Sequence, residues 1–107
     1  MGYKPNKAMQ AAAQTALNYN ENAVASQRWG TRVGTARARK LAAGLEFNRT
    51  EIAQIFAFLK RFEKDYKAQQ ASKKYGKGYY AFLGWGGPTG IAWAEEKLTA
   101  YENATNR

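Results

Sequence analysis

The stretch NRTEIAQIFAFLKRFEKDY, residues 48–66, carries the clearest structural signal in the sequence. Its apolar side chains recur at intervals of three and four residues, which is the spacing of one face of an α-helix. Asn48 can cap the N-terminus of this helix, and Glu51 stands three residues later, as in a capping box. The pattern predicts a helix whose core-facing side consists of Ile52, Ile55, Phe56, Leu59, Phe62 and Tyr66.

Helical patterns also precede this stretch. Residues 6–19 form an amphipathic segment that either frays at its asparagines or continues to about Gln27. A loop is expected over residues 28–35, followed by a short helix over about Thr35–Ala43. Gly44 stands where a left-handed C-terminal cap belongs.

The part of the chain that follows is less regular. The polar, glycine-containing segment 68–78 predicts a mobile loop. The apolar segment 79–85 is too short for its period to distinguish a strand from a helix. Three residues, Gly86-Gly87-Pro88, then break the chain, and Pro88 suits the first turn of a last helix that continues to about Tyr101.

Together these segments predict an all-α protein of four to five short helices, with a glycine-rich turn before the last one. The 107 residues suffice for one hydrophobic core, so we expect a single domain over residues 1–107 with an ordered core of about 5–101. The final residues Glu102–Arg107 are expected to fray. The side chains expected to be largely buried are Ile55, Phe56, Leu59, Trp85 and Trp93.

The composition excludes several classes of protein. The chain has no cysteine and no histidine, which excludes disulfide scaffolds, zinc-thiolate sites and the usual catalytic triads. No apolar run approaches the roughly 20 residues that span a bilayer, and no signal peptide is apparent, so we expect a soluble, non-secreted protein without membrane contact. The eight acidic residues form no carboxylate pair at catalytic spacing, and we expect no enzyme activity, no cofactor and no bound metal.

The charge balance predicts a polyanionic partner. Seventeen Lys and Arg residues against eight acids give a net charge of +9, and residues 28–77 alone hold thirteen of the bases and four of the acids. Such a basic segment favours nucleic acid over a membrane surface, although an ordinary solvated surface is the alternative. The residues expected to bind nucleic acid are Arg37, Arg39, Lys40, Lys60, Arg61, Lys64, Lys67, Lys73, Lys74 and Lys77.

These bases are expected to form one positive patch. A turn at Gly44 would fold the helix that carries Arg37, Arg39 and Lys40 back toward the longer helix, which leaves the bases of both at a common rim. Contacts of this kind hold phosphates without distinguishing bases. Tyr75 or Tyr79 could add stacking on exposed bases, which would favour single strands. A helix-turn-helix interpretation of residues 31–62 fits poorly, because Lys40 occupies a position that is usually small.

The glycine-rich segment 84–90 resembles a phosphate-binding loop only superficially. It lacks the Gly-Lys-Ser/Thr ending, and no clear strand precedes it. A tight turn between two helices is the favoured interpretation, and phosphate binding at the N-terminus of the last helix is the alternative. The expected structural motif consists of Trp85, Gly86, Gly87, Gly90 and Trp93.

Three segments together resemble a small helical module of tailed phages and prophages, found alone or attached to head-morphogenesis proteins such as prohead proteases. They are YKPNKAMQAAA (3–13), VGTARARKLAAG (33–44) and LGWGGPTGIAWA (83–94). The resemblance covers about residues 3–98, and its most specific part is a Trp-Gly-Gly-x-x-Gly-x-x-Trp-Ala motif. One departure is Phe62-Glu63, where the module commonly has His-Glu. The resemblance implies a phage origin, in the host cytoplasm or the virion, but no activity.

Two functions remain open at this point. The first is a non-enzymatic phage protein whose basic surface contacts nucleic acid, mainly at phosphates, in virion assembly or DNA handling. It predicts binding that weakens steeply with salt. The second is a protein-interaction module that docks onto a phage head or assembly partner through aromatic side chains such as Trp85 or Tyr80. It predicts binding that depends on those rings and little on salt.

Overall fold

The structure, a computed structural model, describes residues 2–105, in which every regular element is a helix apart from one isolated β-bridge. The predicted all-α class is confirmed. In chain order the elements are α1 (Lys7–Asn22), a short 3₁₀ turn η1 (Ala25–Gln27), α2 (Arg32–Ala42), α3 (Arg49–Ser72), α4 (Lys77–Gly84) and α5 (Gly90–Thr105).

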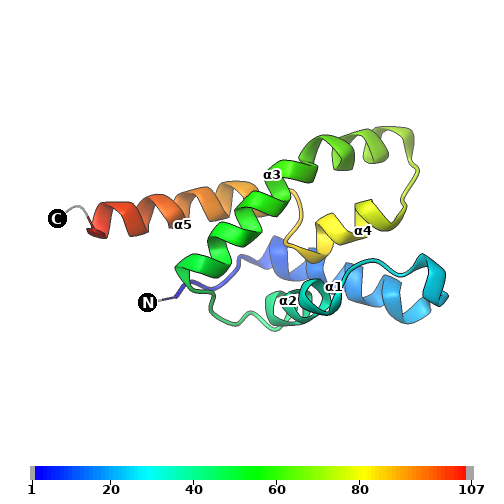
Figure 1. Cartoon of the computed structure of the whole chain (residues 1–107), viewed down its shortest axis with the longest axis horizontal. Coiled ribbons are helices and arrows are strands. Elements are labelled where there is room, and N and C mark those ends of the chain that lie inside the picture. The colour runs from blue at the N-terminus through cyan, green and yellow to red at the C-terminus, as the bar shows by residue number, and fades with distance from the viewer. Residues whose placement is uncertain (1, 106–107) are drawn as a thin grey trace.

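The helices form two packed groups with α4 between them (Figure 1). Helix α1 packs against α2 and α4, and α3 packs against α4 and α5. Helix α3 runs obliquely across the molecule, α4 returns beneath its C-terminal half, and α5 extends past its N-terminal half toward the opposite end. The result is an elongated shape with principal extents of 50 × 26 × 21 Å.

Helix α3 begins as its sequence predicts and ends later. The Asn48 side chain accepts a hydrogen bond from the Glu51 amide, and the Glu51 carboxylate accepts one from the Asn48 amide, both at 2.9 Å. This confirms the capping box. The helix continues to Ser72 and ends at Lys73, whose φ of 58° is left-handed.

The loop predicted over residues 68–78 is therefore wrong for most of its length. Only residues 73–76 connect α3 to α4. Alanine, glutamine and lysine favour helix, so polar composition alone did not end α3. The apolar segment 79–85, which its period left open, lies in helix α4 up to Gly84, with Trp85 as the C-cap. Phe82 in this helix stacks on Tyr66 of α3 with ring centroids 4.2 Å apart.

Helix α2 begins three residues before the predicted start. The Thr31 hydroxyl accepts a hydrogen bond from the Gly34 amide at 3.2 Å and so caps the helix there. Gly34 is buried inside the helix, where an added Cβ would lie 3.3 Å from Nε1 of Trp85. At the other end Gly44 has a φ of 70°, as predicted for a left-handed cap.

The first and last helices differ from expectation at their ends. Helix α1 stops at Asn22, and the turn η1 follows it instead of a continuous helix to Gln27. Pro88 lies two residues before α5 rather than in its first turn. Helix α5 includes most of the segment that was expected to fray, and residues 106 and 107 lie outside the described residues.

The segment before α1 is held by an interaction that the sequence did not reveal. Tyr3 and Phe47 exchange two backbone hydrogen bonds, at 3.0 and 2.9 Å, in an isolated antiparallel bridge. Phe47 is fully buried and Lys40 lies over its ring at 4.5 Å. The bridge ties the start of the chain to the connection between α2 and α3.

The core contains one large residue that helical patterns could not indicate. Trp29, in the connection before α2, is only 2% exposed. Its indole Nε1 donates to the Ala16 carbonyl at 2.9 Å, while its backbone N–H and C=O both pair with the Asn20 side chain at 3.1 Å. Its ring fits against Gly84, where a Cβ would overlap it.

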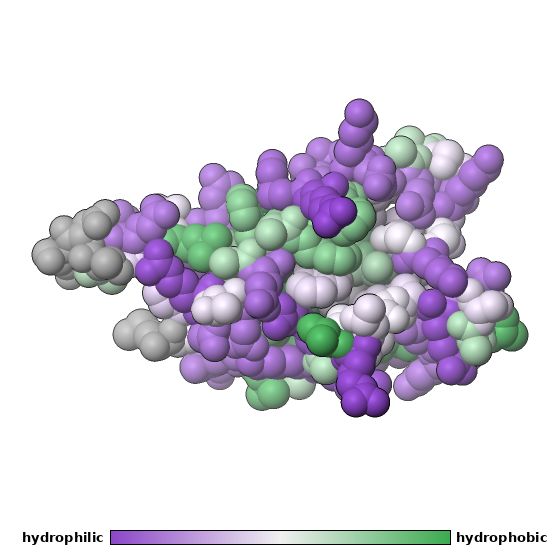
Figure 2. Space-filling view, viewed as in Figure 1, coloured by the Kyte–Doolittle hydropathy of each residue, from purple (hydrophilic) through white to green (hydrophobic). Residues whose placement is uncertain are grey.

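Three of the five side chains that were predicted to be largely buried are buried in the structure. Ile55, Leu59 and Trp93 are buried, whereas Phe56 and Trp85 are only half-buried. Trp85 lies flat on Phe58, with ring centroids 4.3 Å apart, and so covers a surface of α3 rather than filling the centre. Figure 2 shows a band of hydrophobic surface across the middle of the displayed face, with hydrophilic side chains around it.

The glycine-rich turn before α5 is closely packed. Gly86 and Gly87 have φ angles of 122° and 73°, which L side chains rarely adopt. A Cβ on Gly90 would lie 2.6 Å from Leu59, so α5 could not approach α3 as it does with any larger residue. Trp93 donates from Nε1 to the Lys4 carbonyl at 3.1 Å. The motif joins α4, α5 and the N-terminal segment.

Candidate functional site

The structure places the three predicted basic residues of α2 on two different faces. Residues three apart on a helix share a face, whereas residues two apart do not. Arg37 and Lys40 accordingly lie toward α3, while Arg39 lines a cavity on the side of α1. The expectation that these three residues form one patch is therefore wrong.

Arg37 and Lys40 are engaged within the protein. The Arg37 guanidinium donates to the Gln54 side chain at 2.7 Å and lies 5.1 Å from the centre of the Trp85 ring. Lys40 pairs with Glu51 at 2.8 Å. Burial lowers the pKa of Arg37, partly offset by Glu51. Both bases therefore hold α2 against α3, which leaves them less free to bind a ligand.

Glu51 is the acidic centre of this contact. Desolvation acts to raise its pKa, but hydrogen bonds from the Lys40 ammonium and the Asn48 amide, with the charges of Lys40 and Arg37, lower it overall. The carboxylate thus serves the helix cap and the ion pair at the same time.

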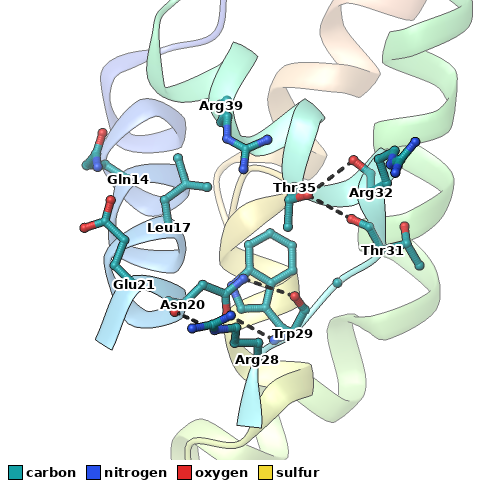
Figure 3. A pocket seen from close by; sticks show the side chains of 11 residues that line it. Gln14, Leu17, Asn20, Glu21, Arg28, Trp29, Thr31, Arg32, Thr35 and Arg39 are labelled. Atoms are coloured by element: carbon teal, nitrogen blue, oxygen red, sulfur yellow. Dashed lines mark hydrogen bonds between the residues drawn. The ribbon is translucent and has the colours of Figure 1, made fainter. Parts of the chain in front are cut away.

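On its other face α2 borders a cavity of about 650 Å³ (Figure 3). It lies between α1, α2 and the connection that contains Trp29. Arg28, Arg32 and Arg39 line it together with Glu21 and the hydroxyl-bearing Thr35. We call this cavity, with its three arginines, the arginine cleft.

Backbone contacts shape the arginine cleft. Arg28 donates from Nε to the carbonyls of Asn20 and Ala23, each at 3.1 Å, which anchors its side chain at the end of α1. Thr35 donates to the carbonyls of Thr31 and Arg32 at 3.0 and 3.2 Å. Between these groups lies the buried Trp29, so the floor of the cleft belongs to the core.

The arginine cleft carries uncompensated positive charge. Within residues 2–105, none of its three arginines has a carboxylate at ion-pair distance, and Glu21 is the one acid in the lining. Arg28 and Arg32 were not among the predicted binding residues. The signal that could have indicated them is the segment RWGTR (28–32), in which two arginines flank an aromatic residue and a glycine.

The predicted bases of α3 differ in how far they are neutralised. Lys60 and Lys67 approach the two oxygens of Glu63 at 3.9 and 3.5 Å. Arg61 lies 5.3 Å from the centre of the Phe62 ring. Lys64 has no acidic partner at ion-pair distance among the described residues.

The remaining predicted bases surround the connection between α3 and α4. Lys73, Lys74 and Lys77 are exposed, and in the described part of the chain no carboxylate pairs with them. Lys77 also borders a second, apolar hollow together with Trp29. Two tyrosines were expected to stack on nucleobases. Tyr79 instead stacks on Tyr66, with ring centroids 5.0 Å apart, while Tyr75 is exposed.

Residues 2–105 contain neither a cluster of metal-ligating side chains nor a helix that could span a membrane. No three acidic side chains gather there in a way that would hold a metal ion. None of the helices described is both long and apolar enough to cross a bilayer. Comparison of the chain with protein-family models, curated proteins and solved structures found no match.

Proposed function

We propose that the protein is a non-enzymatic nucleic-acid-binding protein that holds phosphates in the arginine cleft. The observation that supports it is the lining of that cleft, which includes three arginines, Arg28, Arg32 and Arg39, and a single carboxylate, Glu21. Guanidinium groups donate to phosphate oxygens in pairs and keep their charge at any physiological pH. Their contacts hold a strand without reading its bases.

The exposed lysines would extend this surface electrostatically. Lys77, the first residue of α4, borders the hollow next to the arginine cleft, and Lys73 and Lys74 lie in the connection that precedes it. Lysine side chains without an acidic partner attract a polyanion over a distance of about one Debye length, roughly 8–10 Å at physiological salt. The place of this binding in virion assembly or DNA handling rests on the resemblance to the phage module alone.

The alternative, a protein-docking module that uses Trp85 or Tyr80, has less support. Trp85 lies between Phe58 on one side and the Arg37 guanidinium on another. Tyr80 is stacked on Tyr19 with ring centroids 3.8 Å apart. Both rings are therefore largely occupied by the protein's own side chains.

A salt-dependent binding titration with matched variants tests the proposal. The Arg32→Gln, Arg39→Gln double variant removes two charges from the cleft, and the Lys60→Gln, Lys67→Gln variant removes two charges that share the single carboxylate of Glu63. The cleft variant should bind random-sequence DNA about tenfold or more weaker. Its slope of log K against log salt should be shallower by about 1.4–1.8, since each phosphate contact contributes about 0.7 to 0.9. Equal loss in the two variants would contradict the proposal.

A further inference from the structure

The arginine cleft has an apolar neighbour. A second hollow of about 310 Å³ lies between α3, α4 and the connection before α2, and its lining includes Phe58, Phe62, Ala81 and Lys77. We call it the aromatic hollow. Trp29 and Gly30 line both cavities, so the two adjoin along one short piece of backbone.

The backbone that separates the two cavities carries no side chain at Gly30. Gly30 is exposed, has a φ of 88° and carries no side chain. Trp29 is turned into the core and is fixed there by its hydrogen bonds to Ala16 and Asn20. A ligand that occupies both cavities would therefore cross backbone rather than a bulky side chain.

The aromatic hollow has the chemistry of a site for a flat ring. Phe58 and Phe62 lie 4.8 Å apart at an angle of 48°, and both are half-buried, so part of each ring remains open. One face of Phe58 stacks on Trp85, with ring centroids 4.3 Å apart, which limits its movement. The volume lies at the lower end of the usual range for small-molecule sites, about 300–1,000 Å³.

We propose that the two cavities form one site for single-stranded nucleic acid, with a phosphate in the arginine cleft and an unstacked base in the aromatic hollow. This proposal rests on the proposed function and adds the substrate class. A nucleotide joins a flat apolar ring to an anionic phosphate, which matches an apolar hollow beside an arginine-lined cleft. Bases of a duplex are stacked and cannot enter, whereas those of a single strand can stack on aromatic side chains.

The charges around the aromatic hollow favour this occupant. Lys77 stands at its border, and the Arg61 guanidinium lies over the Phe62 ring, 5.3 Å from its centre. A strand that leaves the hollow would meet these two basic side chains, and a strand that enters it would come from the arginine cleft. Both ends of the path are therefore positive, as a polyanionic chain requires.

The test separates binding of bases from binding of phosphates. Three probes of equal length are compared by fluorescence anisotropy: an oligothymidine, an abasic strand and a duplex. Ala81→Leu fills the aromatic hollow, and Ala92→Leu, on the exposed surface of α5, is the matched control. Phe62→Leu removes an aromatic face while keeping an apolar side chain, and thermal melts verify that every variant is folded.

Wild type and Ala92→Leu should bind the oligothymidine about tenfold tighter than the abasic strand, because stacking of a base on aromatic rings has an effect of this order. Ala81→Leu and Phe62→Leu should abolish this difference and leave abasic-strand affinity unchanged. A folded Ala81→Leu variant that binds oligothymidine like wild type overturns the base site and leaves the hollow to a protein partner. Phosphate binding in the cleft would survive that result, whereas failure of all three probes to bind would refute both proposals.

Discussion

The six-membered part of the Trp29 indole packs directly on the backbone of Gly84, with no room for a side chain between them. Trp29 comes from the irregular connection before α2, and Gly84 is the last residue of α4. This contact lets α4 approach the connection closely. Trp29 also lines both the arginine cleft and the aromatic hollow.

Replacement of Gly84 should therefore be destabilising. Gly84→Ala forces a Cβ into the Trp29 ring and should lower the free energy of unfolding by about 1–3 kcal/mol or more, the usual effect of overpacking. Gly78→Ala, in the same helix, meets only the flexible Gln69 amide and should be neutral or stabilising by up to about 1 kcal/mol. Chemical denaturation of both variants measures the difference. Equal stability of the two would show that Trp29 does not pack as described.

Neighbouring residues of α3 should differ in their contribution to stability. Ile55 is fully buried, so Ile55→Ala should destabilise the protein by about 2–5 kcal/mol. Phe56 is half-buried, and Phe56→Ala should cost less than the roughly 3–5 kcal/mol of a fully buried phenylalanine. Thermal and urea unfolding compare them. A larger loss for Phe56 than for Ile55 would mean that the helix is rotated from the orientation described.

The two faces of α2 should separate folding from binding. Arg37→Met loses the hydrogen bond to Gln54 and should reduce stability by about 0.5–1.5 kcal/mol with little effect on DNA affinity. Arg39→Met, in the arginine cleft, should leave stability within about 0.5 kcal/mol and weaken binding. Unfolding curves and anisotropy titrations of the same two variants provide both readouts. The reverse pattern would restore the binding role predicted for Arg37.

Acid should weaken the contact between α2 and α3. The pKa of Glu51 is lower in the folded protein, so its stabilisation is present above the ordinary pKa of about 4.3 and is lost as the pH falls through the folded value. Glu51→Gln should therefore destabilise the protein at neutral pH, by about 1 kcal/mol or less for a partly exposed pair, and much less at about pH 3. Urea denaturation at the two pH values checks this. An undiminished difference in acid would assign the effect to something other than the charge.

Alkali should reveal the burial of Tyr66. Burial, with the nearby Tyr79 and Tyr75, raises the pKa of Tyr66 to about 12, above the ordinary value of about 10. Because the raised value belongs to the folded state, the associated stability is present below about pH 10 and is lost as the pH rises toward 12. Tyrosinate absorbance should include a component that ionises near pH 12, which Tyr66→Phe removes. A titration unchanged by that substitution would contradict the assignment.

Local signals in the sequence determined the elements whose causes lie within a few residues. The capping box of Asn48 and Glu51 and the left-handed cap at Gly44 were predictable, because each depends on groups three or four residues apart. The apolar period of α3 likewise predicted four of its six core-facing side chains as buried, whereas Phe56 and Phe62 are half-buried. The length of α3 was not predicted, since polar residues at 68–72 are compatible with both helix and loop.

Tertiary structure alone decided which basic residues are free and what stands beside them. Arg37 and Arg39 are equivalent in the sequence, yet one is engaged by Gln54 and Trp85 and the other lines a cavity with arginines from outside its predicted helix. Trp29 belongs to a segment with no periodic pattern, and it is buried because Ala16, Asn20 and Gly84 surround it. Hydrophobic period and charge are local properties, whereas burial and ion pairing depend on which distant segments the packing brings together.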